Sequence, residues 1–256
     1  MADVALRLLS FASILGGLLT AWKLSRHELA RVYRFFFGYL IFRALYGLPL
    51  LSLNLKSNWY EYIYVACWPV CWGFYVGTVL ELYRLILARH RGFYTLGRWA
   101  MCAALAISAA LSAAALLPKI TPQMPQPTVV MGYLIAGERA IDASLAVFLL
   151  LMLAFLNVYT VPLARNTLAH AAIYTVFFLS STLRMMLASI FGIRLATAFD
   201  LGMAATSCAC LLAWFILLNA KGEEMHLSVP WFGPEREERI LYRLDALNAT
   251  LMRAGK

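Results

Sequence analysis

The sequence is poor in charged residues. Asp, Glu, Lys and Arg make up 14% of its 256 residues, while 62% are hydrophobic and the mean hydropathy is +0.73. A typical soluble domain has about a quarter charged residues, so an ordinary soluble fold is excluded. The apolar residues are gathered into long runs, which indicates an integral membrane protein.

Motifs of the common enzyme classes are also absent. The chain has no phosphate-binding glycine loop, zinc motif or nucleophile elbow, and its last apolar run holds no lysine for a retinal Schiff base. We therefore predict no catalytic residue and no metal site, and the sequence leaves any cofactor unidentified. An enzyme is the less favoured class. We expect the four histidines to be interfacial, because they fall at or beyond the cytoplasmic ends of the runs: His27, His90, His170 and His226.

Cysteine usage argues against a secreted disulfide framework. All five cysteines lie in apolar runs: Cys67, Cys71, Cys102, Cys208 and Cys210. The amino terminus lacks a basic segment and a small-residue cleavage site, so we predict that the first run is a retained span.

Seven runs are long enough to cross a bilayer, which takes about 20 residues of helix. The predicted fold is therefore an all-α, polytopic, seven-helix bundle over residues 1–220, followed by a cytoplasmic linker and amphipathic helix over residues 221–256. The predicted spans are Val4–Trp22, Tyr33–Leu53, Trp59–Leu87, Trp99–Leu117, Thr128–Val161, Ala169–Phe191 and Thr197–Asn219.

Basic residues are distributed unevenly between the two sides of this bundle. Of 22 Lys and Arg residues, fifteen fall in the tail or in the loops after the first, third and fifth spans, and four fall on the opposite side. The positive-inside rule then predicts a cell-membrane protein with its amino terminus outside and its carboxyl terminus in the cytoplasm. The net charge of +9 follows from this topology, so nucleic-acid binding is not expected.

Charged residues also interrupt the spans themselves. A charge at mid-bilayer costs roughly 2.5–3.5 kcal/mol on insertion scales, so it usually has a partner or a function. Orientation places the charges of the fifth, sixth and seventh spans in their outer parts, where we predict either an outward-facing polar pocket for a ligand or a structural salt-bridge network. Arg43, near the middle of the second span, is expected to reach them, and Glu61 begins the third span. The predicted cluster is Glu138, Arg139, Asp142, Arg184, Asp200, Arg43 and Glu61.

An aromatic motif surrounds a proline in the third span. Trp68 and Trp72 are four residues apart, which places them on one helix face, and Pro69 between them is expected to kink the helix. These three residues form either a wall for an apolar ligand or ordinary packing around a kink, and packing is the favoured interpretation.

The tail carries one apolar seam. Pro234 opens a predicted helix, in which four residues share a face: Ile240, Leu244, Leu247 and Leu251. A helix of about two heptads is only marginally stable alone. We therefore expect it to dock on its own bundle, a second copy, or a partner membrane or cytoplasmic protein, with the surface of the lipid bilayer as the alternative.

Seven spans with an outside amino terminus and a helical tail resemble the membrane sensor regions of bacterial seven-helix receptors. Those regions feed a cytoplasmic output domain, whereas this chain ends after one helix, so output would pass through a separate partner. The pairs Pro122-Gln123 and Pro125-Gln126 resemble one motif of PQ-loop transporters, although the first span lacks its counterpart. Three hypotheses follow: a receptor-like ligand-binding bundle, an accessory subunit of a membrane complex, and a small-solute transporter.

Overall fold

The computed structural model describes residues 2–52, 58–87, 126–158, 163–191, 193–224 and 226–227, together with the single residues 106 and 242. This part of the chain is almost entirely helical. Its long helices are α1 (Ala2–Arg26), α2 (Arg34–Ser52), α3 (Asn58–Leu87), α5 (Gln126–Val158), α6 (Arg165–Phe191) and α7 (Ile193–Leu217). Shorter elements are η1 (Leu29–Arg31), α8 (Ala220–Glu224) and the antiparallel pair β1 (Leu163–Ala164) and β2 (His226–Leu227), in which Leu163 lies opposite Leu227.

The predicted all-α membrane architecture is confirmed in its coarse form. Five helical segments are long and apolar enough to cross a membrane: Val4–Arg26, Arg34–Leu51, Tyr62–Ile86, Arg165–Ala188 and Thr197–Leu217. Helix α5 coincides with the predicted fifth span but is not among these five. The predicted fourth span, Trp99–Leu117, and the tail helix lie outside the described residues, so the count of seven spans stays a prediction.

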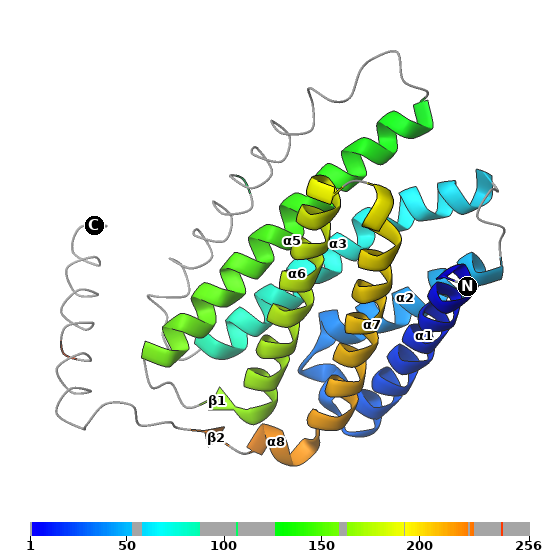
Figure 1. The fold of residues 1–256 in the computed structure, drawn as a ribbon. Coiled ribbons are helices and arrows are strands. Elements are labelled where there is room, and N and C mark those ends of the chain that lie inside the picture. The colour runs from blue at the N-terminus through cyan, green and yellow to red at the C-terminus, as the bar shows by residue number, and fades with distance from the viewer. Residues whose placement is uncertain are drawn as a thin grey trace, which may run out of the picture.

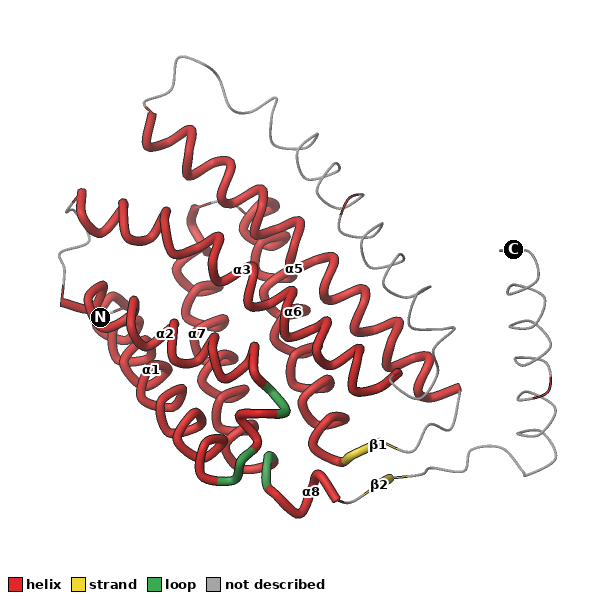
Figure 2. Tube along the Cα trace, turned by 180° about the vertical axis from the view of Figure 1, so that it is seen from behind, coloured by secondary structure: helices red, strands yellow, loops and turns green. Residues whose placement is uncertain are grey.

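The six long helices form a closed ring. Helix α1 packs against α2, α2 against α3, α3 against α5, α5 against α6, α6 against α7, and α7 returns to α1 (Figures 1 and 2). Helix α3 also contacts α6 across the interior. A continuous helix satisfies its own backbone hydrogen bonds, which is why apolar runs of this length adopt it.

Two neighbouring pairs in the ring run parallel. Trp72 of α3 lies against Gly137 of α5, and eleven residues further along both helices the rings of Tyr83 and Phe148 are 5.6 Å apart. Helix α1 likewise runs parallel to α7, because Cys208 donates to the carbonyl of Leu9 and Lys23 donates to that of Phe215. Helices α3 and α5 therefore begin at the same end of the bundle, and so do α1 and α7.

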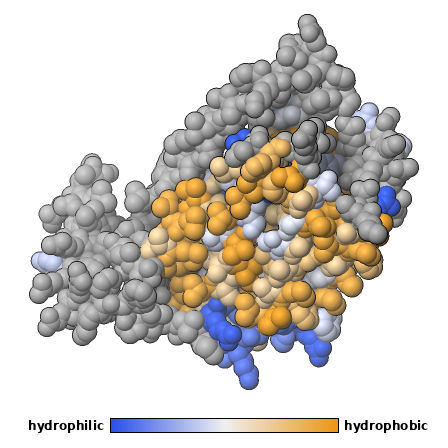
Figure 3. Space-filling model, in the orientation of Figure 1, coloured by the Kyte–Doolittle hydropathy of each residue, from blue (hydrophilic) through white to orange (hydrophobic). Residues whose placement is uncertain are grey.

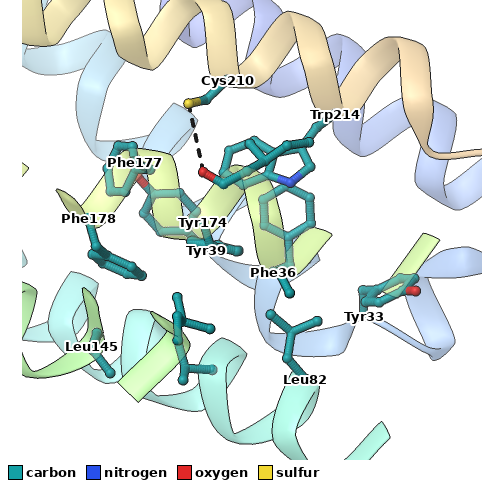
Figure 4. Close-up of a cluster of buried hydrophobic side chains, with 14 of the residues drawn as sticks. Tyr33, Phe36, Tyr39, Leu82, Leu145, Tyr174, Phe177, Phe178, Cys210 and Trp214 are labelled. Atoms are coloured by element: carbon teal, nitrogen blue, oxygen red, sulfur yellow. Dashed lines mark hydrogen bonds between the residues drawn. The ribbon is translucent and has the colours of Figure 1, made fainter. Parts of the chain in front are cut away.

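The bundle is apolar outside and aromatic inside. On the face shown in Figure 3, hydrophobic residues cover most of the described surface, and hydrophilic ones gather at the end near α8. Large side chains are exposed on the flanks, among them Leu8, Phe11, Leu45, Leu151, Leu183, Leu212 and Ile216. The interior cluster in Figure 4 is built largely from rings, including Phe36, Tyr174, Phe178 and Trp214.

Candidate functional site

Charged side chains from three helices meet at the end of the bundle where α6 ends and α7 begins. Glu138 and Asp142 are one turn apart on α5, so they share the face that packs on α6. Ser181 and Arg184 are three residues apart on α6 and face them, and Asp200 lies about two turns into α7. We call Glu138, Asp142, Ser181, Arg184 and Asp200 the carboxylate cluster.

Arg184 is the centre of this cluster. Its Nη1 lies 2.9 Å from Oδ1 of Asp200, and its Nη2 lies 3.3 Å from Oε1 of Glu138. The Glu138 side chain is only 13% exposed, whereas that of Asp200 is 47% exposed. One guanidinium therefore links α5, α6 and α7, with a sheltered ion pair on one side and a more open one on the other.

Asp142 lies deeper in the bundle. It is 2% exposed, and its Oδ2 accepts a hydrogen bond from Ser181 Oγ at 2.5 Å. Its other oxygen, Oδ1, is buried and has no hydrogen-bond partner among the described residues. Asp142 is close enough to Glu138 and Arg184 for their charges to interact.

The cluster has more acids than bases. It holds the carboxylates of Glu138, Asp142 and Asp200 and the single guanidinium of Arg184. Arg139, the next residue to Glu138, projects about 100° around the helix and takes part in no ion pair of the described residues. A site of this composition suits a cation or a proton donor, since a buried carboxylate is unfavourable unless paired. Among the described residues, no three His, Cys, Asp or Glu side chains are grouped to hold a metal ion.

Aromatic residues of α3 border the cluster. The indole of Trp68 lies within interaction distance of Glu138, and its ring stacks on that of Tyr64, with ring centroids 4.5 Å apart. Trp72 lies against the backbone of Gly137. Helix α3 continues on both sides of Pro69, which is exposed.

Of the predicted cluster, the structure places Arg43 elsewhere, and two further predicted features fall outside what it describes. Arg43 donates instead to Ser13 and Tyr39 in another part of the bundle, because the face of α2 that carries it points towards α1 and α3. Glu61 lies in the first turn of α3, with its side chain outside the described residues. The tail seam of Ile240, Leu244, Leu247 and Leu251 also falls outside them.

His170 corrects the expectation of interfacial histidines. It is fully buried in α6, with ring centroids of Tyr33, Phe36, Tyr174 and Trp214 4.5–5.6 Å from its own. The interfacial prediction was wrong because α6 starts at Arg165, one turn before the predicted span, which places His170 in the second turn. Neither ring nitrogen has a hydrogen-bond partner among the described residues.

Comparison with known protein families, curated proteins and solved structures gives no match for this chain.

Proposed function

We propose that this protein is a receptor-like bundle of the cell membrane that binds a small organic cation, such as a protonated amine, at the carboxylate cluster. The observation that supports this most strongly is the grouping of three carboxylates around one guanidinium, with Asp142 buried and one of its oxygens unpaired. A protonated amine would supply the missing positive charge and would donate to that oxygen. Trp68 and Tyr64 offer aromatic faces that favour a cation nearby.

The cluster is also suited to transmit binding along the bundle. Arg184 joins three helices at one end, and the opposite ends of α6 and α7 are tied together through α8. A cation that competes with Arg184 for Glu138 or Asp200 would loosen the contacts of α6 with α5 and α7. In this proposal α8 and the tail carry the change to a separate cytoplasmic partner.

A melting experiment tests the binding step. The purified full chain is heated in uncharged detergent with a panel of primary and quaternary amines, alongside Asp142→Asn and the matched control Glu224→Gln, whose parent residue is exposed on α8. We expect at least one amine to raise the melting temperature of the wild type and of Glu224→Gln, and to lose most of this effect in Asp142→Asn. No response across the panel, or an equal response in Asp142→Asn, contradicts the proposal.

The second candidate is an accessory subunit of a membrane complex. The observation in its favour is that Arg184 pairs with residues of both neighbouring helices, as a purely structural link would. Charge exchange separates the two functions: Arg184→Asp is expected to reduce expression, and Arg184→Asp with Asp200→Arg to restore it if the pair is structural. If the double variant regains expression and the wild type shows no amine response, the protein is better explained as an accessory subunit.

A further inference from the structure

Arg43 occupies a separate polar site near the middle of α2, nine residues after the helix begins at Arg34. Its Nη1 donates to the hydroxyl of Tyr39 at 2.9 Å, and its Nη2 donates to Ser13 Oγ at 2.8 Å. Ser13 and Tyr39 are themselves 4% and 3% exposed, so the guanidinium points into the bundle.

The described groups that contact or face this guanidinium are hydroxyls and thiols. The hydroxyls of Tyr39 and Tyr75 are 3.1 Å apart, and Tyr46, Tyr75 and Cys71 are near enough to interact with the charge of Arg43. Cys208 of α7 is also within that range. We call Ser13, Tyr39, Arg43, Tyr46, Cys71 and Tyr75 the Arg43 site.

The acidic side chains that the structure describes lie elsewhere in the bundle. Of thirteen Asp and Glu residues, three belong to the carboxylate cluster and Glu81 accepts from backbone N–H groups at the start of α2. Asp3 and Glu61 are each ten residues, or about 15 Å along a helix axis, from Ser13 and Cys71 respectively. The rest lie between α1 and η1, in α8, or in the tail: Glu28, Glu223, Glu224, Glu235, Glu237, Glu238 and Asp245.

The undescribed segments between the helices add no carboxylate that could lie beside Arg43. Residues 53–57, 88–125, 159–162 and 192 contain no Asp or Glu. Arg43 therefore places a permanent positive charge within a predicted span. Among the described residues, this charge has no carboxylate neighbour. An arginine side chain stays protonated in proteins, and a charge inside a span is normally paired or serves a substrate.

We propose that the Arg43 site binds a small carboxylate monoanion. Two of the five N–H groups of the guanidinium are used by Ser13 and Tyr39, and the planar arrangement of the others matches the two oxygens of a carboxylate. The hydroxyls of Tyr46 and Tyr75 add donors, and the surrounding rings suit an apolar body on the ligand. Arg43 is nine residues from the start of α2, about 13 Å along its axis, so a free anion fits this depth better than a lipid headgroup.

The test uses sodium benzoate as the probe and equal sodium chloride as its salt control. The purified full chain is titrated in uncharged detergent, and its melting temperature is followed for the wild type, Arg43→Gln and Tyr39→Phe. Arg139→Gln is the matched control, since Arg139 is also an arginine within a predicted span. We expect benzoate to stabilise the wild type and Arg139→Gln beyond the chloride effect. We expect at least a tenfold weaker response in Arg43→Gln and a several-fold weaker one in Tyr39→Phe.

Three results would overturn the proposal. The first is a wild type that responds equally to benzoate and chloride, and the second is an Arg43→Gln variant that responds like the wild type. The third is stabilisation by phosphatidylglycerol in mixed micelles that requires Arg43 and that benzoate does not reproduce, which would assign the site to a lipid headgroup. Asp142→Asn should keep the benzoate response, so failure of the amine site and failure of the anion site are separable.

Discussion

At the scale of single residues, Gly137 determines how closely α5 approaches α3. A Cβ built on Gly137 would lie 2.5 Å from Cη2 of Trp72, which is closer than real contacts allow. The absence of a side chain therefore lets the indole lie against the α5 backbone, next to Glu138. This glycine begins the polar segment 137–142, and it sets the distance between the aromatic residues of α3 and the carboxylate cluster.

Gly137→Ala should destabilise the bundle. Alanine favours a helix over glycine by up to about 1 kcal/mol, but the overlap with Trp72 is expected to cost about 1–3 kcal/mol. Gly202→Ala is the matched control, because a Cβ there meets nothing within 4 Å. Melting in detergent should show a lower midpoint for Gly137→Ala and an unchanged or higher one for Gly202→Ala. Equal midpoints for the two variants would mean that the indole moves aside freely.

At the scale of elements, α2 receives its amino-terminal cap from another helix. The residues before Arg34 include no Ser, Thr, Asp or Asn that could cap it locally. The carboxylate of Glu81 on α3 accepts from the backbone N–H of Arg34 at 2.9 Å and from that of Phe35 at 3.2 Å. A negative charge at this position also complements the positive end of the helix dipole.

Glu81→Ala should weaken the contact between α2 and α3. Two backbone donors would lose their acceptor, which typically costs about 0.5–2 kcal/mol. Glu224→Ala removes an exposed carboxylate from α8 and should have little effect. Hydrogen exchange at Arg34 and Phe35, measured beside the melting midpoint, should rise only in Glu81→Ala. Unchanged exchange there would show that the cap contributes little.

At the scale of the whole molecule, a polar network closes the end of the bundle that contains Tyr33. The Tyr33 hydroxyl donates to Glu223 of α8 and lies 3.3 Å from Thr167 Oγ1. Asn166 donates to the Asn219 carbonyl at 2.7 Å and to Glu223 at 3.1 Å. The loop after α1, the start of α6 and α8 therefore lie on one side of the molecule.

Epitope insertions in the full chain test the orientation of this end. Tags after Glu28 and after Glu224 should both be hidden from antibody in intact cells, because the nearby basic residues are expected to stay in the cytoplasm. A tag between α6 and α7 should be accessible. If one of the first two tags were hidden and the other accessible, the network at Tyr33 would be contradicted. If both were accessible and the tag between α6 and α7 were hidden, the predicted orientation would be contradicted.

Much of the architecture follows from local pattern. Apolar runs of this length in a membrane have to form helices, because the lipid offers no partner for backbone N–H and C=O groups. The four-residue spacing of Glu138 and Asp142 likewise predicts a shared face, and the structure shows that face on α6. Orientation alone predicts Arg184 at the depth of these acids, and in the structure Arg184 pairs with Glu138 and Asp200.

The sequence alone determined that the chain forms apolar helices and which charged residues share a helix face, because both depend on spacing within one segment. Only the tertiary structure decided which faces meet. Arg43 lies among tyrosines rather than acids, His170 lies in the aromatic interior, and Glu81 caps a different helix. These outcomes depend on helix rotation and on the order of helices in the ring, and neither is encoded in the periodicity of any single span.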